Sequence, residues 1–306
     1  DRTLYLVGGS VRDAIVAGDT ASSLADDADL DFTTDARPDE IEAVVAGWAD
    51  AVWEVGIAFG TVGARKGEHL VEITTYRAEA YDRESRKPEV SYGTSLSDDL
   101  VRRDFTVNAM AVRLPSGEFV DLHGGVDDLR AGVLRTPGAP ESSFSDDPLR
   151  MMRAIRFATQ LNFEITQETF SAIQKMASRI TIVSQERITE ELQKMMQTAV
   201  PSKGWYLLKE AGLLEFIFPL LLALQGAETM DGIGHKDNFS HTLQVLDNVA
   251  KNSDDIWLRW AALLHDIAKP KTKKFETGFG WTFHGHEIVG ARMVPKIFTQ
   301  LKLPLN

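Results

Sequence analysis

The sequence contains no cysteine among its 306 residues. This absence excludes disulfide bonds and cysteine-ligated zinc sites, and nothing else in the composition indicates export. Long apolar runs are also missing. None approaches the length of about 18 residues that a membrane-spanning helix needs, and no signal peptide precedes the first apolar segment. We therefore expect a cytoplasmic protein with no membrane partner.

Positive charge is scarce as well. Lysine and arginine total 33 against 45 aspartate and glutamate residues, which gives a net charge of -12. A chain this acidic does not coat nucleic acid electrostatically, so any contact with RNA must use local basic patches and recognition of a strand end. The length is sufficient for two or three domains with cores of their own. Because the chain lacks an initiator methionine and ends at Asn306 within a helical pattern, we expect it to be trimmed.

The pattern of apolar residues changes once along the chain. Residues 1–138 alternate short β-prone and helix-prone pieces, which predicts an α+β domain with a mixed β-sheet and helices. The Thr-Pro-Gly-Ala-Pro stretch at 136–140 is a natural linker. Helical periodicity then continues almost throughout. We divide this part into an all-α neck, 139–200, and an all-α body, 201–306.

The first segment of the chain has the layout of an anion-binding site. Residues 4–7 are β-prone, and Gly8 and Gly9 follow where the backbone can approach a ligand closely. Ser10 is placed to cap the next helix, whose N-terminal N–H groups attract anions. Arg12 adds a fixed cation. Together these residues predict a phosphate-binding turn, although a Gly-Gly pair before a helix is more often a plain turn.

Two carboxylates follow at Asp29 and Asp31. Since Leu30 separates them and Phe32 continues the alternation, a strand would direct both carboxylates to one face and both apolar residues into the core. Two oxygen ligands on one rigid face suit Mg²⁺. The pattern therefore predicts Asp29 and Asp31 as catalytic, metal-binding residues.

Other carboxylates bear on the same site. Asp27 and Asp29 form a rival pair, which we disfavour because Asp26 and Asp27 have the character of a solvated turn. Glu72, on a β-prone segment, is a candidate third carboxylate from a neighbouring strand. An acidic surface edge is the plainer interpretation of such aspartate pairs.

Two further motifs extend the pattern. Residues 102–109 read RRDFTVNA, and residues 146–163 read DDPLRMMRAIRFATQLNF. Together with the Gly-Gly turn and the paired aspartates, they closely resemble the class II tRNA nucleotidyltransferases, or CCA-adding enzymes, and their bacterial poly(A) polymerase relatives in the polymerase-β-like superfamily. The resemblance runs from Leu4 to about Met196 in consecutive motifs, with a weaker match beyond.

This resemblance implies a nucleotidyltransferase head followed by a helical neck and body. It implies template-independent addition of C, C and A to the tRNA 3′ end from CTP and ATP, with release of pyrophosphate. Asp29 and Asp31 would then hold two Mg²⁺ ions for in-line nucleotidyl transfer. The polar segment 77–102 resembles the flexible loop used for A addition. The tRNA 3′ end is the expected partner, no protein partner is evident, and a poly(A) polymerase of the same family is the main alternative.

Asp147 and Arg150 bear on nucleotide specificity. Asp147 precedes Pro148 at the start of a predicted helix, which makes Asp147 and Arg150 neighbours on one surface. Asp offers only acceptors and Arg only donors, which matches the amino group beside a ring acceptor in cytosine and adenine. Uracil and guanine present the reverse order and would leave buried groups unpaired. The pair predicts a protein template for C and A, with a helix cap and surface ion pair as the alternative.

Five more residues take their roles from the resemblance. It implies that Arg103 contacts the triphosphate, that Asp104 lies near the ribose, and that Asn108 braces the motif. Arg153 and Arg156 resemble positions that contact the nucleotide. The residues alone also allow plainer interpretations, namely a helix cap before an apolar run for the first three and surface arginines on an amphipathic helix for the last two.

The body carries a second motif, with His241, then His265 and Asp266, then His284 and His286. It resembles an HD-type phosphohydrolase, in which imidazoles and carboxylates hold a divalent metal. The pattern departs from that family because no aspartate follows Asp266 in this sequence. Packed or surface histidines are therefore the favoured interpretation. An HD-type phosphohydrolase, or a tRNA-binding protein with an inactive head, is the second alternative function.

Overall fold

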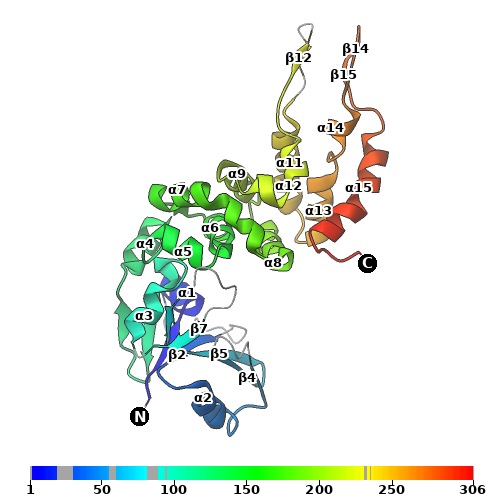
Figure 1. Cartoon of the computed structure of the whole chain (residues 1–306). Helices are drawn as coiled ribbons and strands as arrows, with labels where there is room; N and C mark the ends of the chain where they lie inside the picture. The colour runs from blue at the N-terminus through cyan, green and yellow to red at the C-terminus, as the bar shows by residue number, and fades with distance from the viewer. Residues whose placement is uncertain are drawn as a thin grey trace. The chain divides into compact units, whose positions relative to one another are not determined.

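The computed structural model (Figure 1) describes residues 2–18, 30–54, 60–80, 89–93, 95–230, 233–234 and 236–305. Asp27, Asp29 and part of the predicted 77–102 loop lie outside the described residues. The chain divides into two compact units, Asp1–Asp146 and Asp147–Asn306. The first unit has a mixed sheet with helices and the second is mainly helical, which confirms the predicted fold class. The division of the helical part near residue 200 stays a prediction.

In the first unit, seven of the described strands form one sheet in the order β3-β4-β5-β2-β1-β8-β9. These strands are β1 Leu4–Val7, β2 Leu30–Thr34, β3 Ala51–Glu54, β4 Thr61–Lys66, β5 His69–Thr75, β8 Met110–Leu114 and β9 Phe119–Asp121. Strand β1 runs antiparallel to β2 and β8, whereas β2 runs parallel to β5. The parallel pair sets Asp31 directly opposite Glu72. Because side chains alternate along a strand, the two carboxylates share one face of the sheet.

The other face of β2 belongs to the core. Leu30 and Phe32 pack against a cluster of apolar side chains from β4, β5 and the segment after β2. The buried members of this cluster are Ala36, Ile41, Val45, Val62, Ala64 and Val71. Leu30 and Phe32 therefore face the core as predicted, with Asp31 exposed between them.

Short helices complete this unit. They are α1 Gly9–Ala17, α2 Pro38–Val45, α3 Leu96–Val101, the 3-10 helix η2 Thr106–Asn108, α4 Gly125–Ala131 and α5 Pro140–Asp146. Strands β6 Arg77–Ala80 and β7 Glu89–Tyr92 pair with each other, and β10 spans Val133–Leu134. Helix α4 packs so closely on η2 that a Cβ at Gly125 would lie 2.4 Å from the Thr106 carbonyl oxygen. This contact holds η2 and the residues beside it in place.

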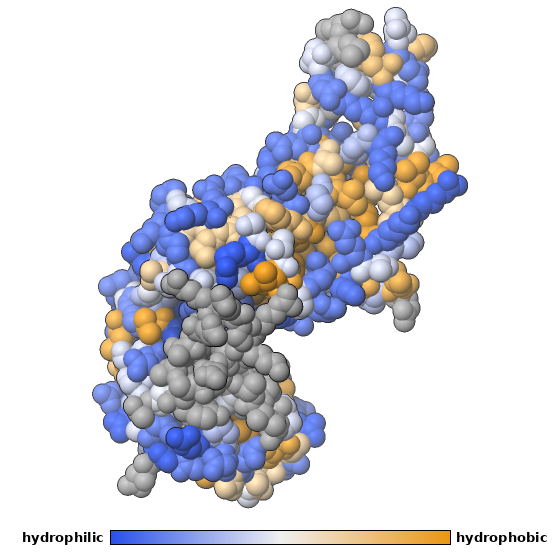
Figure 2. All heavy atoms as spheres, in the orientation of Figure 1, coloured by the Kyte–Doolittle hydropathy of each residue, from blue (hydrophilic) through white to orange (hydrophobic). Residues whose placement is uncertain are grey.

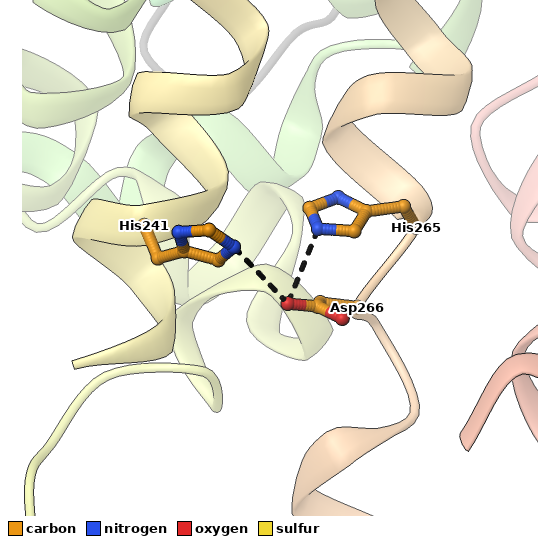
Figure 3. A group of neighbouring side chains, drawn as sticks. All are labelled: His241, His265 and Asp266. Carbon is orange, nitrogen blue, oxygen red and sulfur yellow. Dashed lines mark ion pairs between the residues drawn. The ribbon is translucent and has the colours of Figure 1, made fainter. Parts of the chain in front are cut away.

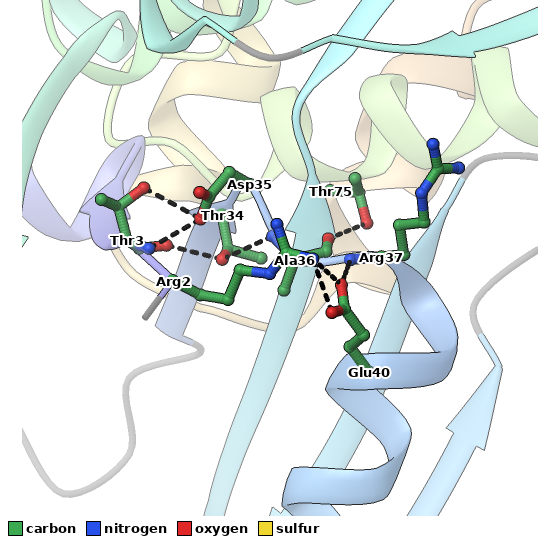
Figure 4. A network of polar contacts seen from close by, with 8 residues as sticks. All are labelled: Arg2, Thr3, Thr34, Asp35, Ala36, Arg37, Glu40 and Thr75. Atoms are coloured by element: carbon green, nitrogen blue, oxygen red, sulfur yellow. Dashed lines mark hydrogen bonds and ion pairs between the residues drawn. The ribbon is translucent and has the colours of Figure 1, made fainter.

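A polar network ties the start of the chain to the end of β2 (Figure 4). The Thr34 hydroxyl donates to the Thr3 carbonyl at 2.6 Å, and the Asp35 carboxylate accepts from the Thr3 backbone N–H and hydroxyl. The Thr75 hydroxyl donates to the Ala36 carbonyl at 2.7 Å and brings β5 into the same corner. These bonds fix the positions of β1, β2 and β5 relative to one another.

The second unit is built mainly from helices. They are α6 Leu149–Gln160, α7 Gln167–Met176, η3 Ala177–Ile182, α8 Gln185–Met196, α9 Ser202–Glu210, α10 Leu214–Ile217, α11 Pro219–Leu222, α12 Asn238–Ala250, α13 Ile256–Leu264, α14 Lys269–Thr272 and α15 His286–Gln300. Its strands are β11 Glu164–Ile165, the pair β12 Thr229–Met230 and β13 Ile233–Gly234, and the pair β14 Lys274–Glu276 and β15 Gly280–Thr282. Trp205 and Trp260 meet edge to face in the core, with ring centroids 6.4 Å apart.

Arg259 of α13 is a buried cation in this core. Its Nη1 donates to the carbonyls of Met196 at 2.6 Å and Thr198 at 2.8 Å, just where α8 ends. Its Nη2 donates to the carbonyls of Ala250 at 3.3 Å and Ser253 at 3.0 Å, where α12 ends. One guanidinium therefore satisfies carbonyls that the ends of two helices leave unpaired.

Apolar side chains gather on the visible surface around α13 and α15, as the orange atoms over the helical unit show (Figure 2). They border a groove of about 470 Å³ between these two helices and residues 304–305. Among the described residues, no helix combines the length and the apolar character that crossing a membrane requires.

Candidate functional site

The turn between β1 and α1 brings three of the predicted residues together. Gly8 has a φ of 77°, a backbone conformation that favours glycine, and it is the N-cap of α1. A Cβ at Gly8 would lie 3.5 Å from Asp31 Oδ2 and 3.5 Å from Arg103 Nη1. The prediction that Ser10 caps the helix is wrong, because α1 starts at Gly9 and its N-cap receives no side-chain hydrogen bond.

Asp31 and Glu72 form the acidic side of this site. Asp31 is exposed on β2, and its register partner Glu72 is exposed on β5. Neighbouring carboxylates supply the oxygen ligands that Mg²⁺ prefers, so the donor set fits the metal. Asp29, the other half of the predicted pair, lies outside the described residues.

Arg103 forms the basic side. Its Nη2 donates to Asp99 Oδ2 at 3.2 Å, an ion pair one turn apart on the chain. Its Nε is buried and has no hydrogen-bond partner among the described residues. An unpaired buried donor costs free energy, so this N–H group would gain from an anionic acceptor placed beside it.

Arg12, Asn108 and Asp104 form an internal network. Arg12 is only 6% exposed, and it donates to both oxygens of Asp13 and, from Nη1, to Asn108 Oδ1 at 2.7 Å. The Asn108 amide donates to Asp104 Oδ1 at 3.0 Å, and that oxygen also accepts from the Phe105 backbone N–H. Asn108 therefore lies where a bracing residue should. The phosphate contact of Arg12 and the ribose contact of Asp104 stay predictions, as does the close approach of Gly9 to a ligand.

Asp147 has a partner that the sequence did not indicate. Its Oδ1 accepts from the Leu149 backbone N–H at 3.1 Å, and its carbonyl accepts from the Arg150 N–H at 3.0 Å. These bonds lie at the start of α6, which begins at Leu149 with Pro148 as its N-cap, so the proline precedes the first turn in which the Asp-Pro pattern placed it. Its Oδ2 pairs with Arg187 of α8 at 3.0 Å. The base-reading role of Asp147 and Arg150 stays a prediction, and Arg187 joins that surface.

Arg153 and Arg156 lie on α6 against Glu191 of α8. Arg156 is 7% exposed, and its Nε donates to the buried Glu191 carboxylate while its Nη1 donates to Gln160 Oε1 at 2.8 Å. Arg153 approaches the same carboxylate at 3.9 Å. This buried cluster joins α6 to α8. A contact of either arginine with the nucleotide stays a prediction.

We expect Glu191→Ala to lower the free energy of unfolding by about 3–5 kcal/mol, because it leaves the buried Arg156 guanidinium without its counter-ion. Chemical denaturation would measure the loss. The exposed neighbour Glu190 provides the matched control, since Glu190→Ala should change stability by less than about 0.5 kcal/mol. Equal effects of the two substitutions would contradict the role assigned to the buried pair.

A second cluster lies in the helical unit, where His241 of α12, His265 and Asp266 meet (Figure 3). Asp266 Oδ2 lies 3.2 Å from His265 Nε2 and 3.8 Å from His241 Nε2. One ligand atom from each of the three residues lies within 4.8 Å of the others. His286, at the start of α15, adds a nitrogen 3.4 Å from Asp266 Oδ1, whereas His284 is exposed. The set of imidazoles and one carboxylate fits a divalent transition metal.

Charges around Asp266 favour its ionised form. Burial opposes ionisation, but hydrogen bonds from His265 and Lys269 outweigh it and lower the pKa of Asp266 to about 2. The hydrogen bond to Asp266 raises the pKa of His265. Lys269 Nζ lies 2.6 Å from Asp266 Oδ2, so an ammonium group faces the same carboxylate as the histidines. The arrangement around Asp266 therefore favours a metal site over the interpretation of these histidines as packed or surface side chains.

Sequence models of three known regions match this chain in order. A Poly A polymerase head domain matches residues 4–135, a probable RNA and SrmB binding site of polymerase A matches 162–224, and an HD domain matches 238–304. These matches define a class of protein in which a nucleotidyltransferase head is followed by RNA-binding and HD regions. The chain belongs to the class II CCA-adding enzyme family.

Individual relatives agree with this assignment. The A-adding tRNA nucleotidyltransferase of Deinococcus radiodurans is 39% identical over 218 residues, or 69% of this chain and 49% of that protein. The CCA-adding enzyme of Streptococcus sanguinis is 33% identical over 272 residues, or 89% of this chain and 62% of that protein. The chain spans about half the length of most of the curated relatives that it matches.

Solved structures give the same picture. The CCA-adding enzyme of Bacillus stearothermophilus, in complex with CTP, is 29% identical with a TM-score of 0.65, covering 88% of this chain and 60% of that one. A tRNA nucleotidyltransferase complexed with a primer tRNA and an ATP analogue is 24% identical with a TM-score of 0.62, covering 97% and 80%. The latter likeness shows the fold alone.

Proposed function

We propose that this chain adds C, C and A to the 3′ end of tRNA from CTP and ATP. The observation that carries the proposal is the approach of Asp31 and Arg103 to Gly8, with Glu72 beside Asp31. Carboxylates for metal and a cation for phosphate thus flank a turn whose positive φ at Gly8 favours glycine. Membership of the class II CCA-adding enzyme family supports the reaction, and a cytoplasmic location is part of the proposal.

The residues would divide the work as follows. Asp29 and Asp31 would hold two Mg²⁺ ions, and these ions would supply activation of the tRNA 3′ hydroxyl and stabilisation of the leaving pyrophosphate. Gly8 and Gly9 admit the triphosphate to the N-terminus of α1, and Arg103 donates to its oxygens. Arg12 and Asn108 keep this turn rigid. Asp147 and Arg150 select the base by accepting from its amino group and donating to the adjacent ring nitrogen.

The test is incubation of the chain with tRNAs that end before C74, C75 or A76, each with a single NTP, followed by sequencing of the products. CCA addition predicts C on the first two tRNAs and A on the third. Repeated A on every tRNA would indicate a poly(A) polymerase instead. A alone, on the third tRNA only, would indicate an A-adding enzyme like the relative from Deinococcus radiodurans. No incorporation by any NTP would reject the proposal.

The cluster at Asp266 favours a second activity, metal-dependent hydrolysis of a phosphoester. His241, His265 and Asp266 would hold the metal, and a metal bound there would supply an activated water. Lys269 carries positive charge next to the same carboxylate, where it could pair with a phosphate oxygen. This activity is independent of the head, because none of these residues belongs to the first unit.

We expect His265→Ala to weaken binding of Mn²⁺ or Ni²⁺ by at least the roughly 10- to 100-fold that loss of an outer-shell partner costs, because it removes one of three metal ligands, and to leave nucleotide addition unchanged. Isothermal titration calorimetry would measure metal binding, and incorporation of CTP would be followed in parallel. The exposed His284 provides the control, since His284→Ala should change neither quantity. If His265→Ala binds the metal as tightly as wild type, the histidines do not form a metal site and serve only in packing.

A further inference from the structure

We propose that a groove at the C-terminal end of α6 binds a backbone phosphate of the tRNA. The groove has a volume of about 340 Å³ and is lined by Arg156, Gln160, Lys194, Gln197 and Thr198. The inference rests on the proposed function, because it names a contact of the same RNA substrate. Arg156 supplies a fixed positive charge to this groove, and its contact with the incoming nucleotide stays a prediction.

The chemistry of the lining is that of an anion site. Each of the five side chains can donate a hydrogen bond, and none is a carboxylate. In a chain with a net charge of -12, such a groove is the local basic patch that RNA binding requires. Glu191, the nearby carboxylate, is buried and paired with two arginines, so its charge is already compensated.

A hydrogen bond between two lining residues orients their donors. Arg156 Nη1 donates to Gln160 Oε1 at 2.8 Å. A guanidinium has no acceptor, so the oxygen of the Gln160 amide must face Arg156. The NH₂ group of Gln160 is then left for a ligand. Because Arg156 is 7% exposed and donates to both Glu191 and Gln160, the cation is held in place before any RNA arrives.

The end of a helix ordinarily disfavours an anion, because its free carbonyls carry partial negative charge. Here that charge is offset. The buried Arg259 guanidinium donates hydrogen bonds to the Met196 and Thr198 carbonyls from inside the core. Lys194, in the last turn of α8, is exposed and forms no ion pair within the described part of the chain. Its ammonium group is thus available to a phosphate.

Position in the chain identifies the anion as RNA. Lys194, Gln197 and Thr198 fall within residues 162–224, the region matched by the model of an RNA-binding site. A phosphodiester presents two non-ester oxygens, which can accept from the donors of Lys194 and Gln160 that line the groove. Contacts of this kind position an RNA without reading its sequence.

The test measures binding of a tRNA that lacks its 3′ CCA to Lys194→Gln, by filter binding between about 50 and 200 mM salt. Loss of one phosphate contact should weaken binding by about 5- to 10-fold at low salt and reduce the slope of log K against log salt by about 0.7–0.9. Gln197→Glu, which places a carboxylate in the groove, should weaken binding at least as much. Both residues are exposed, so the substitutions should leave the fold intact.

Lys296→Gln is the matched control, since Lys296 is an exposed, unpaired lysine on α15 of the same unit, within the described residues. It should leave tRNA binding at the wild-type value. The proposal fails if Lys194→Gln and Gln197→Glu both retain wild-type affinity and salt slope, or if they weaken binding of CTP and not of tRNA. Failure of the proposed function is distinguishable, because it would show as no incorporation by the unaltered chain.

Discussion

Replacing Asp31 with alanine is expected to abolish incorporation of both CTP and ATP while tRNA affinity stays nearly intact. Asp31 lies within reach of the Gly8 turn and opposite Glu72, where a carboxylate would ligate metal. Loss of a metal ligand removes several kcal/mol of transition-state stabilisation, so the rate should fall by about a thousandfold or more. Single-turnover incorporation of labelled nucleotide would measure it. Asp29→Ala should behave in the same way.

An exposed aspartate elsewhere in the head serves as the control. Asp127 of α4 is almost fully exposed, and its one ion pair with a described residue is a long contact with Arg130, at 3.7 Å. Asp127→Ala should therefore retain the wild-type rate. A rate above about a tenth of wild type in Asp29→Ala or Asp31→Ala would rule out the proposed metal pair.

Asp147→Ala should blunt selection of C and A over U and G by one to two orders of magnitude and slow the incorporation of both CTP and ATP. Each mispaired buried group costs about 1–3 kcal/mol, which sets this range. The reversed pair, Asp147→Arg with Arg150→Asp, exchanges the order of acceptor and donor. It should favour uracil or guanine at the expense of cytosine and adenine. Competition between labelled NTPs would measure the selectivity.

Arg187→Gln separates base selection from the ion pair that the structure shows. It removes the 3.0 Å contact with Asp147 Oδ2 but leaves the Asp147 acceptors in place. Selection of C and A should therefore persist. If Asp147→Ala selects C and A as sharply as wild type, or if Arg187→Gln loses selectivity to the same extent, Asp147 is a helix cap and ion-pair partner and base recognition lies elsewhere.

The strand with Asp31 shows what local pattern can predict. Period-two alternation sends Leu30 and Phe32 to the core, and a register pairing places Glu72 beside Asp31. The alternation follows from the geometry of consecutive residues in one strand, whereas the pairing of Asp31 with Glu72 depends on how two separate strands meet. The prediction that Ser10 caps the helix is wrong because Gly8 adopts a positive φ and is itself the N-cap. The geometry of the turn, and not helix propensity, therefore sets where α1 starts.

Partners that lie far apart in the sequence could not be predicted in this way. Asn108 is 96 residues from Arg12, and Glu191 is 35 residues from Arg156. Each pairing depends on how separate elements pack, which no local pattern contains. The spacing of Glu191 four residues after Arg187 on an amphipathic helix was the available signal for α8. It becomes informative only once α8 is known to lie against α6.

The buried position of Arg259 determines where the helical unit can be divided. A fragment that began near residue 200 would keep the guanidinium but lose the Met196 and Thr198 carbonyls that accept from it. Its core would then enclose a charge with two acceptors missing, which is costly in an apolar interior. The HD region could be transferred to another protein only together with the end of α8, or with new acceptors in its place. The domain boundary predicted from the sequence, near residue 200, is therefore not a position at which this chain can be cut.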